Sequence, residues 1–142
     1  MYKLQKVAPV LYQISAAIVD RKHAYNKQTL HQAARVIADT LGTAFSGVNT
    51  EPFRRALKSK ESLFGEGNFT IIGTDSTTSL GGGVFYNAMA ISSTDYDEGH
   101  RKAVGHPASM IVPVALILGE HLKASKLERF KSVIIGYEIA TR

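Results

Sequence analysis

Apolar side chains recur every three or four positions along most of the chain, which is the period of an α-helix that packs on one face. Residues 28–46 show this pattern most clearly. Their expected buried stripe consists of Leu30, Ala34, Ile37, Leu41 and Phe45. Small residues beside the stripe would let a second helix approach closely. They are Ala33, Ala38, Gly42 and Ala44.

The same spacing, with the usual start and stop signals, predicts further helices. Pro9 should delay or kink the first one, and Ser125 with Glu128 has the spacing of a capping box. The expected helices cover residues 3–20, 28–46, 51–60, 79–92, 107–122 and 125–142. Residues 61–78 are expected to be loop, with a short extended stretch at 69–72. The pattern therefore predicts an all-α helical bundle with little or no strand.

The last predicted helix keeps its apolar period up to Arg142, with no Gly, Pro or capping residue after it. A domain seldom stops in the middle of a helix. We therefore expect residues 1–142 to form a single helical domain that is truncated.

Composition narrows the class of protein. The chain has 142 residues, 44% of them hydrophobic, which suits one globular domain, and it has no cysteine for disulfides or Cys-based zinc sites. Residues 1–60 carry ten Lys/Arg and three Asp/Glu, but these are scattered and no nucleic-acid motif accompanies them, so we expect no nucleic-acid partner. The longest apolar run, residues 110–119, is far shorter than the ~20 residues of a membrane span. No membrane contact is expected, and a cytoplasmic location is the default.

Candidate chemistry is concentrated in the polar loop expected between residues 95 and 106. It holds Asp95, Asp97, Glu98, His100 and His106. Carboxylates can orient an imidazole, and imidazole exchanges protons near neutral pH, so acid/base catalysis is one interpretation. The same residue types could bind a metal, although the order fits neither an EF-hand nor an HExxH site. A third interpretation is a solvated loop whose acids cap a helix.

Short motifs follow one another in a fixed order over the second half of the chain. They are Ile72-Gly73, Asn87-Ala88, Asp95-Tyr96-Asp97-Glu98, His106-Pro107, Pro113-Val114-Ala115, Gly119-Glu120, and Gly136-Tyr137-Glu138 with Arg142. Upstream stand Asp39-Thr40-Leu41-Gly42 and Ser46-Gly47. In this order and spacing, over about residues 30–142, they resemble the MmgE/PrpD family. Gly99, where many relatives have Thr, and Ala88, where Gly is usual, depart from it and suggest a different substrate or a decayed site.

The resemblance implies a function as well as a fold. Members of that family eliminate from, decarboxylate or epimerise small polycarboxylic acids, such as methylcitrate- or aconitate-like acids, by proton transfer without a cofactor. It implies that Asp95 and His106 are catalytic, that Asp97 and His100 bind substrate, and that no metal is needed. His106 would exchange the proton or bind a substrate carboxylate, and Asp95 would orient it or share in the transfer.

The resemblance also implies that the chain is incomplete. Family members continue into a second, mixed α/β domain that supplies further catalytic residues. We therefore expect a dehydratase-type lyase fragment that needs a completing partner chain, or that forms a homodimer to cover its apolar faces. The alternative is a non-catalytic helical remnant or an oligomerising interaction protein.

Overall fold

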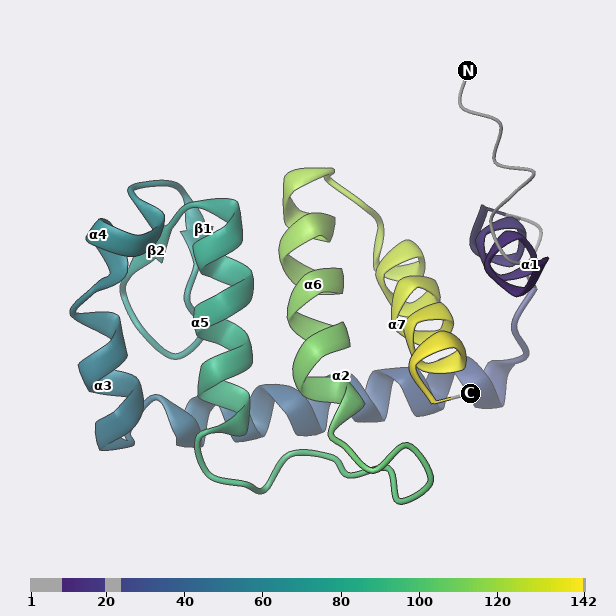
Figure 1. Cartoon of the computed structure of the whole chain (residues 1–142), viewed down its shortest axis with the longest axis horizontal. Helices are drawn as coiled ribbons and strands as arrows, with labels where there is room; N and C mark the ends of the chain where they lie inside the picture. Colours follow the sequence, from purple (N-terminus) through teal and green to yellow (C-terminus); the bar gives the residue numbers. More distant parts are fainter. Residues whose placement is uncertain (1–8, 20–23, 142) are drawn as a thin grey trace.

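The computed structural model describes residues 9–19 and 24–141, and the all-α expectation is confirmed for them (Figure 1). Within these ranges the chain forms seven helices and two very short strands. The elements are α1 (Pro9–Val19), α2 (Lys27–Gly47), α3 (Glu51–Leu57), α4 (Lys60–Phe64), β1 (Phe69–Thr70), β2 (Thr77–Thr78), α5 (Leu80–Ser92), α6 (Pro107–His121) and α7 (Lys126–Ala140). No helix in the described ranges is both long and apolar enough to cross a membrane.

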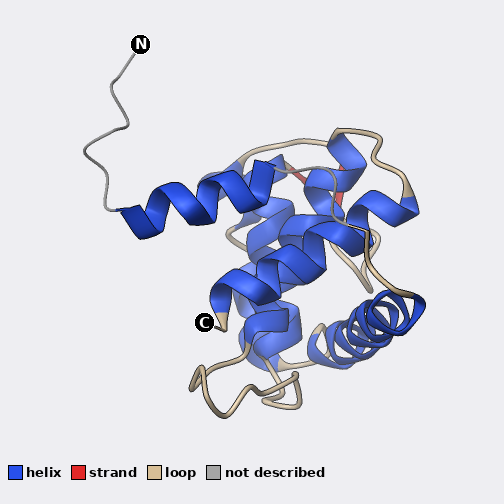
Figure 2. Ribbon diagram, turned by 90° about the vertical axis from the view of Figure 1, so that its right-hand side faces the viewer, coloured by secondary structure: helices blue, strands red, loops and turns tan. Residues whose placement is uncertain are grey.

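Helix α2 runs across the row formed by α5, α6 and α7, and contacts all three (Figure 1). Helices α3 and α4 and the antiparallel β1–β2 pair lie on the far side of α5. The loop between α5 and α6 lies below α2 in Figure 1, at the ends of the two helices that it connects, and the view in Figure 2, turned by 90°, shows it projecting from the helices. The helices therefore present this loop at an open edge of the molecule.

Two hydrophobic clusters hold the row on α2. The first joins the C-terminal part of α2 to α3, α5 and the residues after β1, and its buried members are Ala44, Phe53, Ile71, Tyr86, Ala90 and Ile91. The second joins the middle of α2 to α6 and α7, and its buried members are Ile37, Ala108, Val112, Ala115 and Val133. The loop between α5 and α6 thus connects a helix of the first cluster to a helix of the second.

The buried face of α2 differs from the predicted stripe. Ile37 is buried as expected, but Phe45 is 58% exposed, and the other buried residues of the helix are small ones. They are Ala33, Thr40, Ala44 and Gly47. The prediction for Phe45 was wrong because the close crossing places small residues of α2 against its neighbours, as Gly47 does against the Ala90 backbone, and Phe45 lies outside that face.

Helix boundaries largely follow the local signals. The first helix starts at Pro9, and Ser125 with Glu128 forms a complete capping box on α7. The expected helix 51–60 was wrong in extent: it ends at Leu57, and a separate helix, α4, spans Lys60–Phe64, most of which was expected to be loop. The predictions for residues 3–8, residue 20 and Arg142 lie outside the described residues.

Asn87 ties the β1 region to α5. Its side chain is fully buried, accepts a hydrogen bond from the Ile72 backbone N–H at 2.8 Å, and donates to the Thr70 carbonyl at 2.9 Å. Two backbone groups beside the core are thereby satisfied by one amide. This contact gives a structural reason for an Asn at the motif position.

The crossing of α2 and α5 generates the first prediction. A Cβ on Gly47 would overlap the carbonyl of Ala90, whereas a Cβ on Gly42, in the same helix, would meet nothing within 4 Å. We expect Gly47→Ala to lower the free energy of unfolding by about 3 kcal/mol through overpacking. Gly42→Ala should raise it by roughly 1 kcal/mol through helix propensity. Urea unfolding followed by circular dichroism measures both, and equal effects would contradict the close crossing.

Candidate active site

His106 stands where the loop turns into α6. It occupies the N-cap position, and Pro107 follows at the first helical position, where its missing N–H costs nothing. The backbone carbonyl of His106 accepts a hydrogen bond from the Ser109 hydroxyl at 2.8 Å. The start of α6 therefore fixes the His106 backbone and leaves its side chain directed along the loop.

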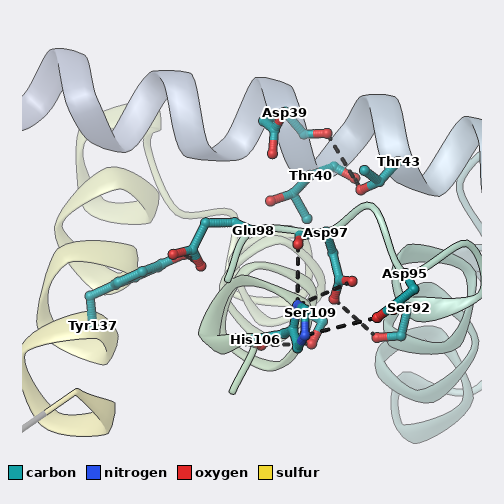
Figure 3. A network of polar contacts seen from close by, with 10 residues as sticks. All are labelled: Asp39, Thr40, Thr43, Ser92, Asp95, Asp97, Glu98, His106, Ser109 and Tyr137. Atoms are coloured by element: carbon teal, nitrogen blue, oxygen red, sulfur yellow. Dashed lines mark hydrogen bonds and ion pairs between the residues drawn. The ribbon is translucent and has the colours of Figure 1, made fainter. Parts of the chain in front are cut away.

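The buried carboxylate of Asp97 lies against one nitrogen of the His106 ring (Figure 3). His106 Nδ1 is 3.3 Å from Asp97 Oδ1 and 3.1 Å from the backbone oxygen of the same residue. The Asp97 side chain is only 2% exposed, and its other oxygen accepts a hydrogen bond from the Ser92 hydroxyl at 3.3 Å. A backbone oxygen can only accept, so this contact is a hydrogen bond in the tautomer that carries the hydrogen on Nδ1. In that tautomer the neutral ring keeps its free lone pair on Nε2.

Asp95 lies on the other side of the ring. Its carboxylate is 93% exposed, and Oδ1 is 3.9 Å from His106 Nε2. The backbone of Asp95 has a φ of 56°, in the left-handed region that Asp tolerates better than most residues. Water screens this pair, so it contributes little to stability. Asp95 therefore places a carboxylate beside Nε2 without burying it.

These three side chains could be considered as metal ligands, because their ligand atoms lie within 4.8 Å of one another. In the tautomer with the hydrogen on Nδ1, only Nε2 has a lone pair for an ion, and it lies 3.9 Å from Asp95 Oδ1. In that tautomer the contact of buried Asp97 with Nδ1 orients the imidazole.

His100, expected to bind substrate, takes part in the turn of the loop. Its Nδ1 accepts a hydrogen bond from the Ala103 N–H at 3.1 Å, and its backbone N–H donates to the Gly105 carbonyl at 2.9 Å. No hydrogen bond or ion pair joins it to Asp95, Asp97 or His106, all of which the structure describes. The geometry therefore brings Asp95, Asp97 and His106 together and leaves His100 as part of the loop framework.

One polar contact at the site was missed by the sequence analysis. Tyr137 of α7 donates a hydrogen bond to Glu98 Oε2 at 2.7 Å (Figure 3). Burial, then the hydrogen bond and charge of Glu98, and finally the charge of Asp39 on α2, raise the pKa of Tyr137 well above its ordinary value. Both residues belong to the sequence motifs, which is the one signal that could have pointed to them.

The site is open to solvent in this chain. The His106 side chain is 44% exposed, and neither of the two principal surface cavities includes a residue of the loop. One cavity, of about 480 Å³, lies by α4 and β2, and the other, of about 360 Å³, lies between α2, α6 and α7. The described residues supply an oriented imidazole and its carboxylates without an enclosing wall.

Comparison with known proteins identifies related sequences. The sequence model of the MmgE/PrpD N-terminal domain matches residues 13–142. A cis-aconitate decarboxylase from Homo sapiens is 30% identical over 120 residues, which are 81% of this chain and 25% of that protein. A cis-aconitate decarboxylase from Mus musculus is 28% identical over 118 residues, covering 80% of this chain and 24% of that protein. The chain thus spans about a quarter of the length of these relatives, and no solved structure matches it.

The raised pKa of Tyr137 predicts how stability changes with pH. Below about pH 10 the phenol is neutral in both the folded and unfolded chain; above it, the unfolded chain loses the proton first, so folding becomes less favourable. We expect Tyr137→Phe to be less stable by about 1–2 kcal/mol at pH 8, from the lost hydrogen bond to a charged group. The difference should shrink between pH 10 and 11.5.

Urea unfolding at successive pH values tests this. Tyr96→Phe removes a phenol from the exposed part of the same loop and should follow the wild-type curve. A Tyr137→Phe curve that stays parallel to wild type above pH 10 would show that Glu98 and burial do not hold the Tyr137 proton.

Proposed function

Because this chain belongs to the MmgE/PrpD family, we propose that it is the helical part of a lyase that acts on a small polycarboxylic acid by acid/base proton transfer. The observation that carries the proposal is the His106 ring, held at Nδ1 by the buried Asp97 carboxylate and open at Nε2. An imidazole fixed in one tautomer by a carboxylate is the arrangement that a general acid or base requires.

Each side chain then has a distinct role. A protonated His106 donates from Nε2 to the substrate carbon that has lost a carboxylate as CO₂, and that carbon's electron pair forms the new C–H bond. Asp97 stabilises the imidazolium before the transfer, because a buried carboxylate interacts strongly with a neighbouring positive charge. Asp95, exposed beside Nε2, helps return a proton from solvent to the ring. The geometry thus favours a role for Asp97 in holding His106 rather than in contacting the substrate.

The substrate class comes from the relatives. Both are cis-aconitate decarboxylases, so we propose an aconitate-like di- or tricarboxylic acid as substrate. These relatives are about four times longer than their matched part, so the groups that enclose the substrate are proposed to come from a completing chain. Proton transfer by one positioned group contributes typically 10²–10⁴-fold to a rate. In this proposal His106 is that group, and the completing chain supplies the walls of the substrate pocket.

A graft onto a relative tests the proposal. The chain replaces the matched quarter of the human cis-aconitate decarboxylase, and CO₂ release from cis-aconitate is measured. We expect His106→Gln to lower kcat by about 10²–10⁴-fold. Asp97→Asn should lower it nearly as much, because no carboxylate then stabilises the imidazolium. His31→Gln, an exposed histidine on α2, is the matched control and should leave the rate unchanged.

A second readout covers the case of a graft that does not fold. Histidine nitrogen signals of the 142-residue chain are followed by NMR while cis-aconitate is added. Signals of His106 should shift and those of His31 should not. A graft with full activity after His106→Gln, or a His106 signal indifferent to millimolar cis-aconitate, would overturn the assignment.

A different observation favours the second candidate function, a helical chain that associates with another copy of itself. Helix α6 exposes an apolar stripe with a spacing of four residues, formed by Met110, Val114, Leu118 and Leu122 just beyond its end. An exposed stripe of this kind on a helix marks an interaction surface.

Light scattering coupled to size-exclusion chromatography tests self-association. We expect the wild-type chain to form a dimer and the double variant Val114→Glu/Leu118→Glu to be monomeric, because charge on the stripe would have to be buried in the interface. Leu63→Glu, at a more exposed leucine on α4, is the control and should remain dimeric. A monomeric wild-type chain would exclude this stripe as a dimer interface.

A further inference from the structure

Two consecutive carboxylates in the loop point to different parts of the molecule. Asp97 extends to His106 and the end of α5, while Glu98 extends the other way, to Tyr137 on α7 (Figure 3). One peptide unit separates the two side chains. A displacement of the Glu98 backbone would therefore also move Asp97, the residue that holds the imidazole.

The loop has little regular structure of its own to resist such a displacement. Asp95 and Val104 both have positive φ, and the bonds that shape the tip, from His100 to Gly105 and from Ala103 to His100, begin and end within the loop. The Asp97–Ser92 hydrogen bond reaches only to the preceding helix. The Tyr137–Glu98 bond, in contrast, joins residues 39 positions apart in the sequence.

Helix α7 is a firm anchor for that bond. Its Val133 is buried in the cluster that α2, α6 and α7 share, and Tyr137 packs against the same cluster one turn later. A hydrogen bond between a half-buried hydroxyl and a carboxylate is short and stronger than one between neutral groups. The contact thus links a loop with little regular structure to a packed helix.

We propose that Tyr137 is a positioning residue, which acts through Glu98 to fix the Asp97–His106 pair. Its hydroxyl holds Glu98, the adjoining peptide holds Asp97, and Asp97 sets the His106 tautomer. Its importance for catalysis rests on the proposed function, but its effect on the His106 ring does not. On this proposal, a change in the position of α7 alters the orientation of the imidazole.

The test uses the whole 142-residue chain and needs no substrate. Tyr137→Phe and Glu98→Ala each remove the tether, Glu98→Gln keeps an acceptor, and Tyr96→Phe removes a surface phenol from the same loop. Nitrogen NMR reports the His106 tautomer, and amide hydrogen exchange reports the His100 N–H that closes the loop. A fold defect would speed exchange in α2 and α5 as well.

We expect Tyr137→Phe and Glu98→Ala to give a mixture of His106 tautomers and to speed exchange at His100 by about tenfold or more, with helix amides unchanged. Glu98→Gln should lie between them and wild type, and Tyr96→Phe should match wild type. The double variant Tyr137→Phe/Glu98→Ala should be no worse than either single change, because both act on one contact.

Two results would overturn the proposal. One is an unchanged His106 tautomer in both tether variants; the other is a double variant whose effects simply add. In the grafted enzyme, the proposal further expects Tyr137→Phe to lower kcat about tenfold with little change in KM. If that graft fails to turn over cis-aconitate at all, the proposed function fails, while the tautomer measurement still decides the role of Tyr137.

Discussion

The close crossing of α2 and α5 determines where the rest of the chain can lie. Gly47 lets the Ala90 backbone approach α2 at a distance that no larger residue permits. With α5 fixed there, α6 and α7 can complete the row along α2. The buried side chains of α2 are all small or β-branched, and Ile37 belongs to the cluster that α6 and α7 share. The loop must then span from the end of α5 to the start of α6 at one edge, which is where the polar residues occur. The packing of small residues in the core thus places the chemistry at the surface.

Within that loop, burial of a single carboxylate organises the other polar groups. Asp97 is removed from water, and a buried charge is costly unless hydrogen bonds or an opposite charge compensate it. Ser92 supplies one hydrogen bond and the Nδ1 side of His106 supplies the other contact. The contact with His106 that offsets the cost of burying the Asp97 carboxylate also fixes the imidazole ring. Stability and the orientation of the ring therefore come from one arrangement.

Sequence patterns predicted the elements better than the contacts between them. Apolar period and capping residues located α2, α5, α6 and α7 to within a few residues, because these signals are local. The buried face of α2 was partly mispredicted, since periodicity favours large apolar residues such as Phe45, while the helix that crosses it requires small ones. The chemistry and motif of the loop predicted that Asp95, Asp97 and His106 belong to one site, and the structure places them side by side. The sequence did not predict that Asp97 is buried and Asp95 exposed, because burial depends on tertiary structure.

The acidic run of the loop illustrates why spacing alone leaves several functions open. Asp95, Asp97 and Glu98 look like one anionic cluster in the sequence, which left catalysis, a metal site and a solvated loop all open. In the structure their carboxylates have three environments: Asp95 faces water beside Nε2, Asp97 is buried against Nδ1, and Glu98 binds the hydroxyl of Tyr137. Two of the three carboxylates lie beside the imidazole of His106, and the third contacts the helix that follows. This division supports the proposed role of the loop in proton transfer.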